Sequence, residues 1–356
     1  MKIVIDIGHP AHVHYFRNFI KIMEKKGHTL LVFARDKEVS QNLLNQYDIP
    51  YVSRGKGSSG FFGKLTYLIK TDFILLFKAL PFKPDIFLSF SSPYAAQVAW
   101  LLRKPHIAFT DTEHAKIENI ASIPFSSTVI TPQCFLKDFG KKHIRFNGFL
   151  ELFYLHKNYF TSNKDIFKLL NIKDDENYII LRFVSWGASH DIGHSGLNDE
   201  TKRELVEELS KDYKIFISSE TELPKEFIQY KLNISPEKMH DVLDNAHLFI
   251  GEGATMASEC AMLGTPAIYV NTLSAGTLIA QEDSGSIFSF NTSVGVLKKA
   301  IEILETPNLE KVFEENSRNL LHDSIDVTAF AVWFVENYPK SIDTIKDNPD
   351  FQSRFK

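Results

Sequence analysis

Residues 247–270 read HLFIGEGATMASECAMLGTPAIYV. The apolar run at 247–250 predicts a buried strand, and the small residues that follow it predict a tight turn. We expect a helix from there to Gly264, a residue type that often ends helices, and Pro266 precedes a second apolar run at 267–270. Strand, turn, helix and strand in this order form a βαβ unit, which implies a parallel sheet with a right-handed crossover.

The same alternation extends outward from this segment. Near the N-terminus, residues 3–7 predict a strand, residues 13–26 a helix that ends at Gly27, and residues 30–33 the next strand. The other predicted strands lie at 85–89, 106–109, 128–130, 178–181 and 214–217, and the other predicted helices include 94–102, 294–304, 309–321 and 327–337. This pattern predicts an α/β protein of two Rossmann-like domains, whose parallel sheets face each other across a cleft that binds ligands at the carboxyl ends of the strands.

The length of 356 residues also fits two domains. The alternation of strands and helices is interrupted at 147–163, which is the predicted linker. We predict an N-terminal domain over 1–155, a C-terminal domain over 165–325, and a helical segment over 326–356 that returns toward the N-terminal domain.

The composition excludes several classes of protein. Lys and Arg number 40 against 44 Asp and Glu, so the chain lacks the basic surplus of a dedicated nucleic-acid binder. The distant pair Cys134 and Cys260 excludes a disulfide framework and a zinc ribbon, and indicates a cytoplasmic protein. No signal-peptide pattern opens the chain, and three charged residues interrupt its longest apolar stretch, 65–82, so no membrane-spanning helix is expected.

The turn at 251–255 has the composition of an anion-binding site. Small residues such as Gly253, Ala254 and Thr255 let the backbone approach an anion closely, and the N–H groups and dipole of the following helix favour phosphate. Glu259 lies in that helix, where its carboxylate could accept hydrogen bonds from two ribose hydroxyls. The alternative is a strand–turn–helix that binds nothing.

This segment resembles the nucleotide-diphosphate-binding motif in the C-terminal domain of GT-B glycosyltransferases, especially the MurG-like enzymes, and the corresponding stretch of the UDP-N-acetylglucosamine 2-epimerases. The turn 253–255, Glu259, Gly264 and Pro266 fit that motif. More narrowly, the chain looks like the DUF354 family, which is placed in the same superfamily. The resemblance implies a GT-B fold with an N-terminal acceptor domain and a C-terminal domain that binds a nucleotide-sugar, most simply a UDP-sugar.

A second group of residues, GHPAHVH at 8–14, follows the first strand and opens the first helix. MurG-like enzymes carry a Gly-rich turn that ends in His-Val here, and the resemblance implies that His12 is the base that deprotonates the acceptor hydroxyl, with Gly8 in the binding turn. An ordinary histidine pKa near ~6.5 suits that role, and His14 is a further candidate acid or base. The alternatives are a histidine that only caps the helix and a metal site; we predict no metal, because no carboxylate or Cys at ligand spacing lies nearby.

A third group lies on the loop after the strand at 178–181. Its basic residue, Arg182, could neutralise a diphosphate. The other residues expected to contact the nucleotide-sugar are Ser185, Trp186 and Gly187, and the candidate acid or base groups are His190, Asp191 and His194. The alternatives are a weak metal site and a loop without a ligand. Because GT-B enzymes commonly stabilise the leaving diphosphate without a metal, the resemblance implies that no cofactor is required.

A fourth group comprises Asp111 and Glu113, which follow the strand at 106–109 and are candidate catalytic carboxylates. The alternative is that Thr110 or Asp111 caps the following helix.

The segment 61–83 alternates Phe, Leu and Ile with Lys and contains a single acid. Such a stretch could contact an anionic membrane surface peripherally, on the inner face of the plasma membrane, where a lipid-linked acceptor would lie. The alternative is an ordinary amphipathic helix packed on the sheet.

Together these patterns favour a UDP-sugar-dependent glycosyltransferase that acts on a glycan or lipid-linked acceptor in polysaccharide or glycoconjugate synthesis. The first alternative is a UDP-sugar 2-epimerase or hydrolase. The epimerases carry a catalytic Asp after the strand that corresponds to 86–89, whereas this chain reads SFSS at 89–92, although Asp111 and Glu113 could supply the acids. The second alternative is a nucleotide-sugar-binding protein without catalytic activity.

Overall fold

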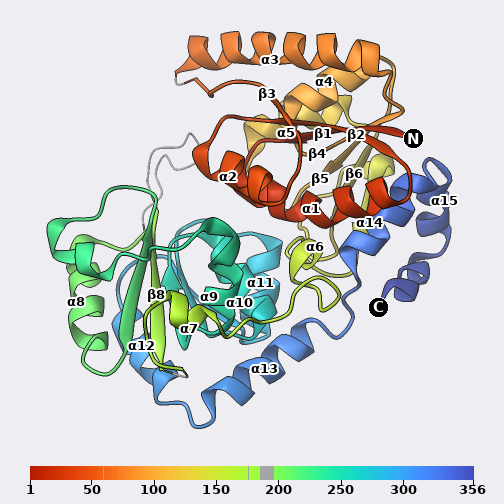
Figure 1. Ribbon diagram of the computed structural model, residues 1–356. Helices are drawn as coiled ribbons and strands as arrows, with labels where there is room; N and C mark the ends of the chain where they lie inside the picture. Colours follow the sequence, from red (N-terminus) through yellow and green to blue (C-terminus); the bar gives the residue numbers. More distant parts are fainter. Residues whose placement is uncertain (59, 175, 185–195) are drawn as a thin grey trace. The chain divides into compact units, whose positions relative to one another are not determined.

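The computed structural model describes residues 1–58, 60–174, 176–184 and 196–356 (Figure 1). The chain forms two compact units. Unit 1 comprises residues 1–159 together with 323–356, and unit 2 comprises residues 160–322. Each unit contains one sheet in which every paired strand is parallel to its neighbour.

Unit 1 is built on a seven-stranded sheet with the order β3-β2-β1-β4-β5-β6-β7. Its strands are β1 (Lys2–Ile7), β2 (Thr29–Ala34), β3 (Val52–Ser53), β4 (Ile86–Phe90), β5 (His106–Phe109), β6 (Thr128–Pro132) and β7 (His143–Phe146). Its α-helices are α1 (Pro10–Lys25), α2 (Glu38–Gln46), α3 (Phe61–Phe82), α4 (Pro93–Leu101), α5 (Lys116–Ser122), α6 (Leu152–Leu155), α14 (Val327–Glu336) and α15 (Lys340–Asp347). Short 3₁₀ helices occupy Ile123–Phe125, Gly140–Lys142 and Pro349–Phe355.

Helices cover both faces of this sheet, so its central strands are buried and apolar, as parallel strands usually are. Val4, Phe33 and Phe87 form a buried cluster with Leu75 of α3 and Val98 of α4. The aromatic side chains of α1 pack in another part of the core; Phe16 of that helix is fully buried.

The C-terminal segment 323–356 belongs to unit 1 because it packs on the strands and helices of the first 159 residues (Figure 1). The N–H of Ile325 donates to the carbonyl oxygen of Asn147 at 3.0 Å, and the hydroxyl of Thr328 donates to the carbonyl oxygen of Phe153 at 2.8 Å. α14 is apolar on most of its surface, and the ring of Phe330 lies 6.2 Å from that of Phe146 in β7.

Unit 2 is built on a five-stranded sheet with the order β12-β11-β10-β8-β9. Its strands are β8 (Tyr178–Phe183), β9 (Lys214–Ser219), β10 (Leu248–Gly251), β11 (Ala267–Val270) and β12 (Ile287–Phe290). Its α-helices are α7 (Ile166–Leu169), α8 (Asp199–Leu209), α9 (Met239–Asp244), α10 (Ala254–Leu263), α11 (Gly276–Asp283), α12 (Val296–Leu304) and α13 (Leu309–Leu320), and 3₁₀ helices occupy Lys225–Tyr230 and Pro236–Lys238.

The predicted α/β class with two Rossmann-like parallel sheets is confirmed. The segment 247–270 forms β10, α10 and β11, and α10 ends at Gly264 in the left-handed conformation (φ +81°). Sequence reasoning missed β3, β7 and β12, which are short strands of two to four residues without a strong period. It also placed a linker over 147–163, but residues 149–155 are buried in unit 1 and include α6, so that part of the prediction is wrong.

Two positions in these sheets favour ligand binding on topological grounds. In unit 1 the chain leaves β1 toward β2 on one side and later returns to β4 on the other; in unit 2 the same reversal occurs between β8 and β10. At such switch points the loops diverge from the carboxyl ends of adjacent strands and leave space for a ligand. In the described parts of the chain, no helix is long and apolar enough to cross a membrane.

Candidate functional site

The turn between β10 and α10 leaves backbone donors available at the switch point of unit 2. Gly253 is the N-cap of α10 and has extended backbone angles (φ −96°, ψ 115°). No side chain among the described residues caps this helix. Residues 253–256 are partly exposed, whereas the helix is buried from Ala257 onward. The first N–H groups of α10 therefore point to an accessible surface, where the helix dipole favours an anion.

The two glycines of this turn have different surroundings. A Cβ atom on Gly251 would lie 2.6 Å from Cζ of Phe249 and 2.7 Å from Cβ of Arg182, so packing inside the protein requires glycine there. A Cβ atom on Gly253 would meet nothing closer than 3.7 Å, which is an ordinary contact with Val184. Among the described residues, Gly253 therefore leaves space above the start of α10, as a close approach of a ligand to the backbone requires.

Glu252, between these glycines, connects several segments around the turn. Sequence reasoning assigned no role to this residue. Its side chain is buried, and its carboxylate accepts hydrogen bonds from the N–H of Val184 at 2.9 Å and from the N–H of Leu197 at 2.8 Å. Its carbonyl oxygen accepts from Nδ2 of Asn271 at 3.1 Å. Glu252 thus ties the segments on both sides of residues 185–195 to the β10–α10 turn. An acid between two glycines, directly after an apolar run, was the sequence signal that could have revealed it.

Glu259, the predicted ribose ligand, is buried and paired. Its Oε1 lies 3.2 Å from Nε2 of His240, and both side chains are almost inaccessible. His240 lies in the first turn of α9, which packs against α10. This contact fixes the position of the Glu259 carboxylate. No spacing in the sequence links residues 240 and 259, so this partner could not be predicted.

Arg182, the predicted cation for a diphosphate, is already paired within unit 2. Its guanidinium donates to Oγ of Ser218 at 2.8 Å and to Oε1 of Glu220 at 2.7 Å. Its charge would reach a diphosphate only in competition with the Glu220 carboxylate. The remaining predicted residues of that loop, Ser185, Trp186, Gly187, His190, Asp191 and His194, lie outside the described residues.

In the β1–α1 turn, at the switch point of unit 1, backbone N–H groups donate to histidine side chains of the turn itself. Nδ1 of His9, the N-cap, accepts from the N–H of Ala11 at 3.3 Å, and Pro10 follows at the first position of α1. The N–H of Gly8 donates to Nδ1 of His12 at 3.3 Å. The start of α1 therefore offers fewer open donors than the start of α10.

His12 lies in the first turn of α1, with its ring centre 4.9 Å from that of Phe90, the last residue of β4. Burial holds its pKa well below the ordinary value of 6.5, and the nearby side chains of His9, Arg54 and Lys37 lower it further. The ring is therefore neutral at neutral pH. Because Nδ1 accepts the Gly8 hydrogen bond, the ring proton is on Nε2, and that nitrogen is a donor in this arrangement.

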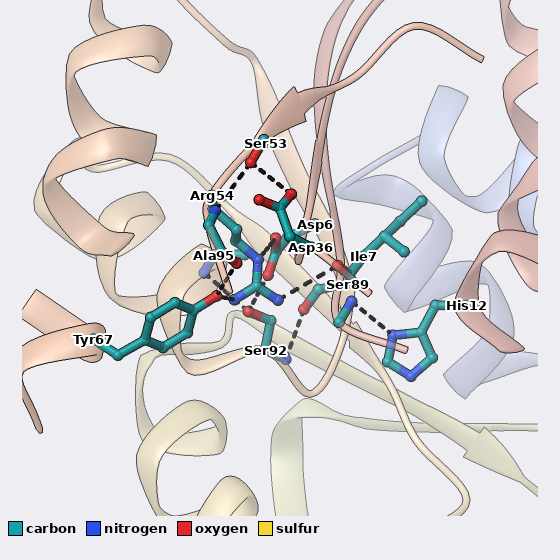
Figure 2. A network of polar contacts seen from close by, with 12 residues as sticks. Asp6, Ile7, His12, Asp36, Ser53, Arg54, Tyr67, Ser89, Ser92 and Ala95 are labelled. Atoms are coloured by element: carbon teal, nitrogen blue, oxygen red, sulfur yellow. Dashed lines mark hydrogen bonds and ion pairs between the residues drawn. The ribbon is translucent and has the colours of Figure 1, made fainter. Parts of the chain in front are cut away.

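A buried polar network underlies this turn, and Figure 2 shows it beside His12. Nε of Arg54 lies 2.9 Å from Oδ1 of Asp6, both side chains are almost fully buried, and the hydroxyl of Ser92 donates to Asp6. The guanidinium also stacks on the ring of Tyr94 at 4.5 Å and donates to the carbonyl oxygen of Ile7 at 3.4 Å. Sequence reasoning missed this pair, because Asp6 occupies a position inside an apolar strand and Arg54 lies 48 residues later.

The other candidate residues of unit 1 are Asp111, Glu113 and His14. Only the first is suited to proton transfer, and the other two support the structure. Asp111 is partly exposed after β5, and burial raises its pKa from 3.8 to about 6. Glu113 is buried, and its Oε1 accepts from the N–H of Leu136 at 3.1 Å. His14 is buried, with Nδ1 3.3 Å from the hydroxyl of Tyr47. It packs between helices.

The alternative explanation of Asp111 and Thr110 as a helix cap is wrong. α5 begins only at Lys116, and its N-cap is Ala115, which makes no capping side-chain bond. Instead, the N–H of Thr112 donates to Oγ1 of Thr110 at 3.3 Å, and the hydroxyl of Thr112 donates to Oδ1 of Asp111 at 2.9 Å. Within residues 1–58, 60–174, 176–184 and 196–356, no three His, Cys, Asp or Glu side chains are grouped so that they could hold a metal ion.

Two Rossmann-like units with parallel sheets, each with a turn at its switch point, define the GT-B class of α/β proteins, and solved structures of that class match nearly the whole chain. The UDP-GlcNAc 2-epimerase of Neisseria meningitidis bound to UDP-GlcNAc matches with a TM-score of 0.66 at 12% identity, over 90% of this chain and 99% of that chain. The Methanocaldococcus jannaschii UDP-GlcNAc 2-epimerase in complex with UDP-GlcNAc and UDP gives 0.62 at 15% identity, over 90% and 100%. Acinetobacter baumannii MurG gives 0.58 at 15% identity, over 94% and 99%. At these identities the likeness shows the fold alone, and it confirms the predicted GT-B architecture.

The chain belongs to the family described as "Protein of unknown function (DUF354)", whose model matches residues 1–284. It is 29% identical over 281 residues to an uncharacterized protein of Methanocaldococcus jannaschii, across 75% of this chain and 81% of that protein. The family predicted from the sequence is therefore confirmed.

Proposed function

We propose that this protein is a glycosyltransferase that takes its sugar from a nucleotide-sugar donor, and that the donor is a UDP-sugar. The observation that carries the proposal is the start of α10, where no side chain of the described residues caps the helix and no described atom lies closer than 3.7 Å to a Cβ atom on Gly253. Further along the same helix, Glu259 is held by His240. Backbone N–H groups at a helix start suit a diphosphate, and a fixed carboxylate suits the two hydroxyls of a ribose. UDP and UDP-GlcNAc are the ligands named for the epimerases that share the fold, which supports this choice of donor.

The chemistry we propose is an attack of an acceptor hydroxyl on the anomeric carbon of the donor sugar. The bond between that carbon and the diphosphate oxygen breaks, the new glycosidic bond forms, and UDP leaves. The N–H groups at 254–256 would stabilise the charge that develops on the leaving diphosphate, usually the largest contribution in such a site. Glu252 would act as a positioning residue, because it holds the segments beside residues 185–195 against the turn.

We propose Asp111 as the group that accepts the proton of the acceptor hydroxyl. With a pKa of about 6, it is mostly ionised at neutral pH and still basic enough to take a proton. His12 would instead donate a hydrogen bond through Nε2, because its other ring nitrogen accepts the Gly8 N–H. This revises the assignment that the resemblance implied, in which His12 was the base.

The second candidate function is a UDP-sugar 2-epimerase or hydrolase. The raised pKa of Asp111 favours it, since epimerisation needs a carboxyl group that can exchange a proton with a sugar carbon near neutral pH. The serines at 89–92 disfavour it, because an acid follows this strand in the epimerases. Release of UDP or an isomerised UDP-sugar in the absence of any acceptor would identify this activity.

The donor site is tested first by the melting temperature of the protein in titrations of UDP and UDP-sugars, with GDP and CDP for comparison. A ligand at 100 times its Kd stabilises the fold by about 2.7 kcal/mol, which gives a clear shift. We expect a shift with UDP compounds in the wild-type chain and a much smaller one in Glu259→Gln. Glu302→Gln, an exposed acid on α12 of the same unit, is the matched control and should behave as wild type.

If the protein is folded and no nucleotide raises its melting temperature, the donor site is refuted, and the proposed glycosyltransferase activity with it. If UDP raises the melting temperature of Glu259→Gln as much as that of the wild-type chain, the proposed role of that carboxylate is refuted. Binding without turnover of any UDP-sugar, with acceptors present, would favour a non-catalytic nucleotide-sugar-binding protein.

A further inference from the structure

α3 is a surface helix that is apolar on two opposite faces. Its inner face, formed by Tyr67, Thr71, Leu75 and Ala79 at four-residue spacing, is buried against the sheet and α4. A helix of this kind normally needs only one apolar face, and the opposite side is expected to be polar. In Figure 1, α3 forms the outermost layer of unit 1.

The opposite face carries five large apolar side chains in one continuous row. They are 45–66% exposed, and we call them the outer stripe: Leu65, Ile69, Phe73, Phe77 and Leu80. The rings of Phe73 and Phe77 stack on each other at 6.0 Å. Exposed apolar residues that gather in one patch of this length mark an interaction surface, whereas single ones need no explanation.

The charge around the outer stripe is positive. Lys64, Lys70 and Lys78 of α3 are exposed, and Lys83 follows at its end. The single acid of the helix, Asp72, is partly buried, and that burial raises its pKa to about 7, so its negative charge is weak at neutral pH. A partner for this face should therefore combine apolar groups with negative charge.

We propose that the outer stripe docks unit 1 on an anionic lipid surface, with α3 lying parallel to the plane of the membrane. Apolar side chains would enter the boundary between headgroups and acyl chains, while the lysines would contact anionic headgroups. A second copy of this chain fits less well, because two such faces would bring their lysines together with only Asp72 as a counter-charge. This inference goes beyond the donor site and does not depend on it.

The test is co-sedimentation of the full chain with vesicles. One set contains phosphatidylcholine alone, and the other contains about one third phosphatidylglycerol, each at low and at high salt. We expect binding to the anionic vesicles that weakens with salt, and a loss of about tenfold or more in Phe73→Gln/Phe77→Gln and in Lys70→Glu/Lys78→Glu. These side chains are exposed, so the variants should fold, which their melting temperatures and their response to UDP would verify.

The matched control is Leu169→Gln/Ile228→Gln, which removes two apolar side chains of unit 2 that are 58% and 57% exposed. Its vesicle binding should equal that of wild type. The inference is overturned if the wild-type chain does not bind the anionic vesicles, or if the control loses as much binding as the stripe variant. It is also overturned if light scattering shows an oligomer that the stripe variant dissociates while vesicle binding stays the same, because the stripe would then contact another copy of the chain.

Discussion

The turns β1–α1 and β10–α10 have the same topology, and each lies at the switch point of its sheet, yet they use their polar groups differently. The first turn is satisfied internally: His9 caps α1, and His12 accepts from Gly8. The second has no capping side chain among the described residues, and its buried acids Glu252 and Glu259 bind neighbouring segments of the protein. Two turns of the same topology therefore differ in how many backbone N–H groups find an acceptor among the described side chains, and our proposal of a donor site at the second turn rests on that difference.

The buried groups behind the two turns differ as well. Behind the first, Asp6 and Arg54 form a closed ion pair that offers nothing to a ligand (Figure 2). Behind the second, the carboxylate of Glu252 bonds to backbone N–H groups on both sides of an adjoining segment. The first arrangement joins β1 to the residue directly after β3, and the second holds Val184 and Leu197 against the turn at which we propose the donor binds. Variants that separate stability from binding would test this contrast.

The largest effect is expected from Arg54→Ala. It leaves the Asp6 carboxylate buried without its partner, which usually costs about 3–5 kcal/mol in the free energy of unfolding. Urea denaturation would measure it, and Asp6→Asn in the same chain should recover part of the loss. A loss below about 1 kcal/mol would mean that the pair is not the support of the first turn.

The next largest effect is expected on kcat when the N–H group of the His12 ring is removed. If Nε2 donates a hydrogen bond to a substrate, His12→Ala should lower kcat by about a hundredfold, the effect of losing one well-placed donor. His12→Gln keeps an N–H group at a similar reach and should retain much of the rate. Equal loss in both variants, with a pH profile that changes in both, would instead indicate that His12 is the base.

The two glycines of the second turn should respond in opposite ways. Gly251→Ala forces a Cβ atom against Phe249 and Arg182 and should cost about 1–3 kcal/mol of stability. Gly253→Ala has room and should cost less than about 1 kcal/mol, but its methyl group would obstruct a bound diphosphate and weaken UDP binding about tenfold. Melting curves and UDP titrations on both variants make the measurement. Unchanged UDP affinity in Gly253→Ala would show that no ligand approaches that backbone.

The smallest effect is a pH dependence from Asp111. Its pKa in the folded protein is about 6, above the ordinary 3.8, so the folded state holds this proton more tightly than the unfolded chain. Its contribution to stability is therefore complete below pH 4 and is lost as the pH rises through about 6. Asp111→Asn should flatten the dependence of unfolding free energy on pH in that window by about 1 kcal/mol, after allowance for solvent screening. An unchanged slope would mean that this carboxyl is not perturbed.

Local sequence patterns were sufficient to predict the fold class. Apolar runs, Gly264 after a helix and the repeated βαβ order predict two parallel sheets, because these signals act over a few residues and do not depend on distant contacts. They also predict the candidate donor turn at 253–255. They fail for β3, β7 and β12, whose few residues form strands only because a neighbouring strand in the sheet offers hydrogen bonds.

The sequence by itself therefore determined the α/β class, the family, and the position of the turn that could bind a phosphate. Only the tertiary structure decided which polar groups are available there. Arg182 is paired with Glu220, Glu259 with His240, and Nδ1 of His12 with the N–H of Gly8. Each of these pairings depends on side-chain positions and burial that arise when separate elements pack together. Residue spacing along the chain does not specify them, because a hydrogen bond is set by distance and direction in space.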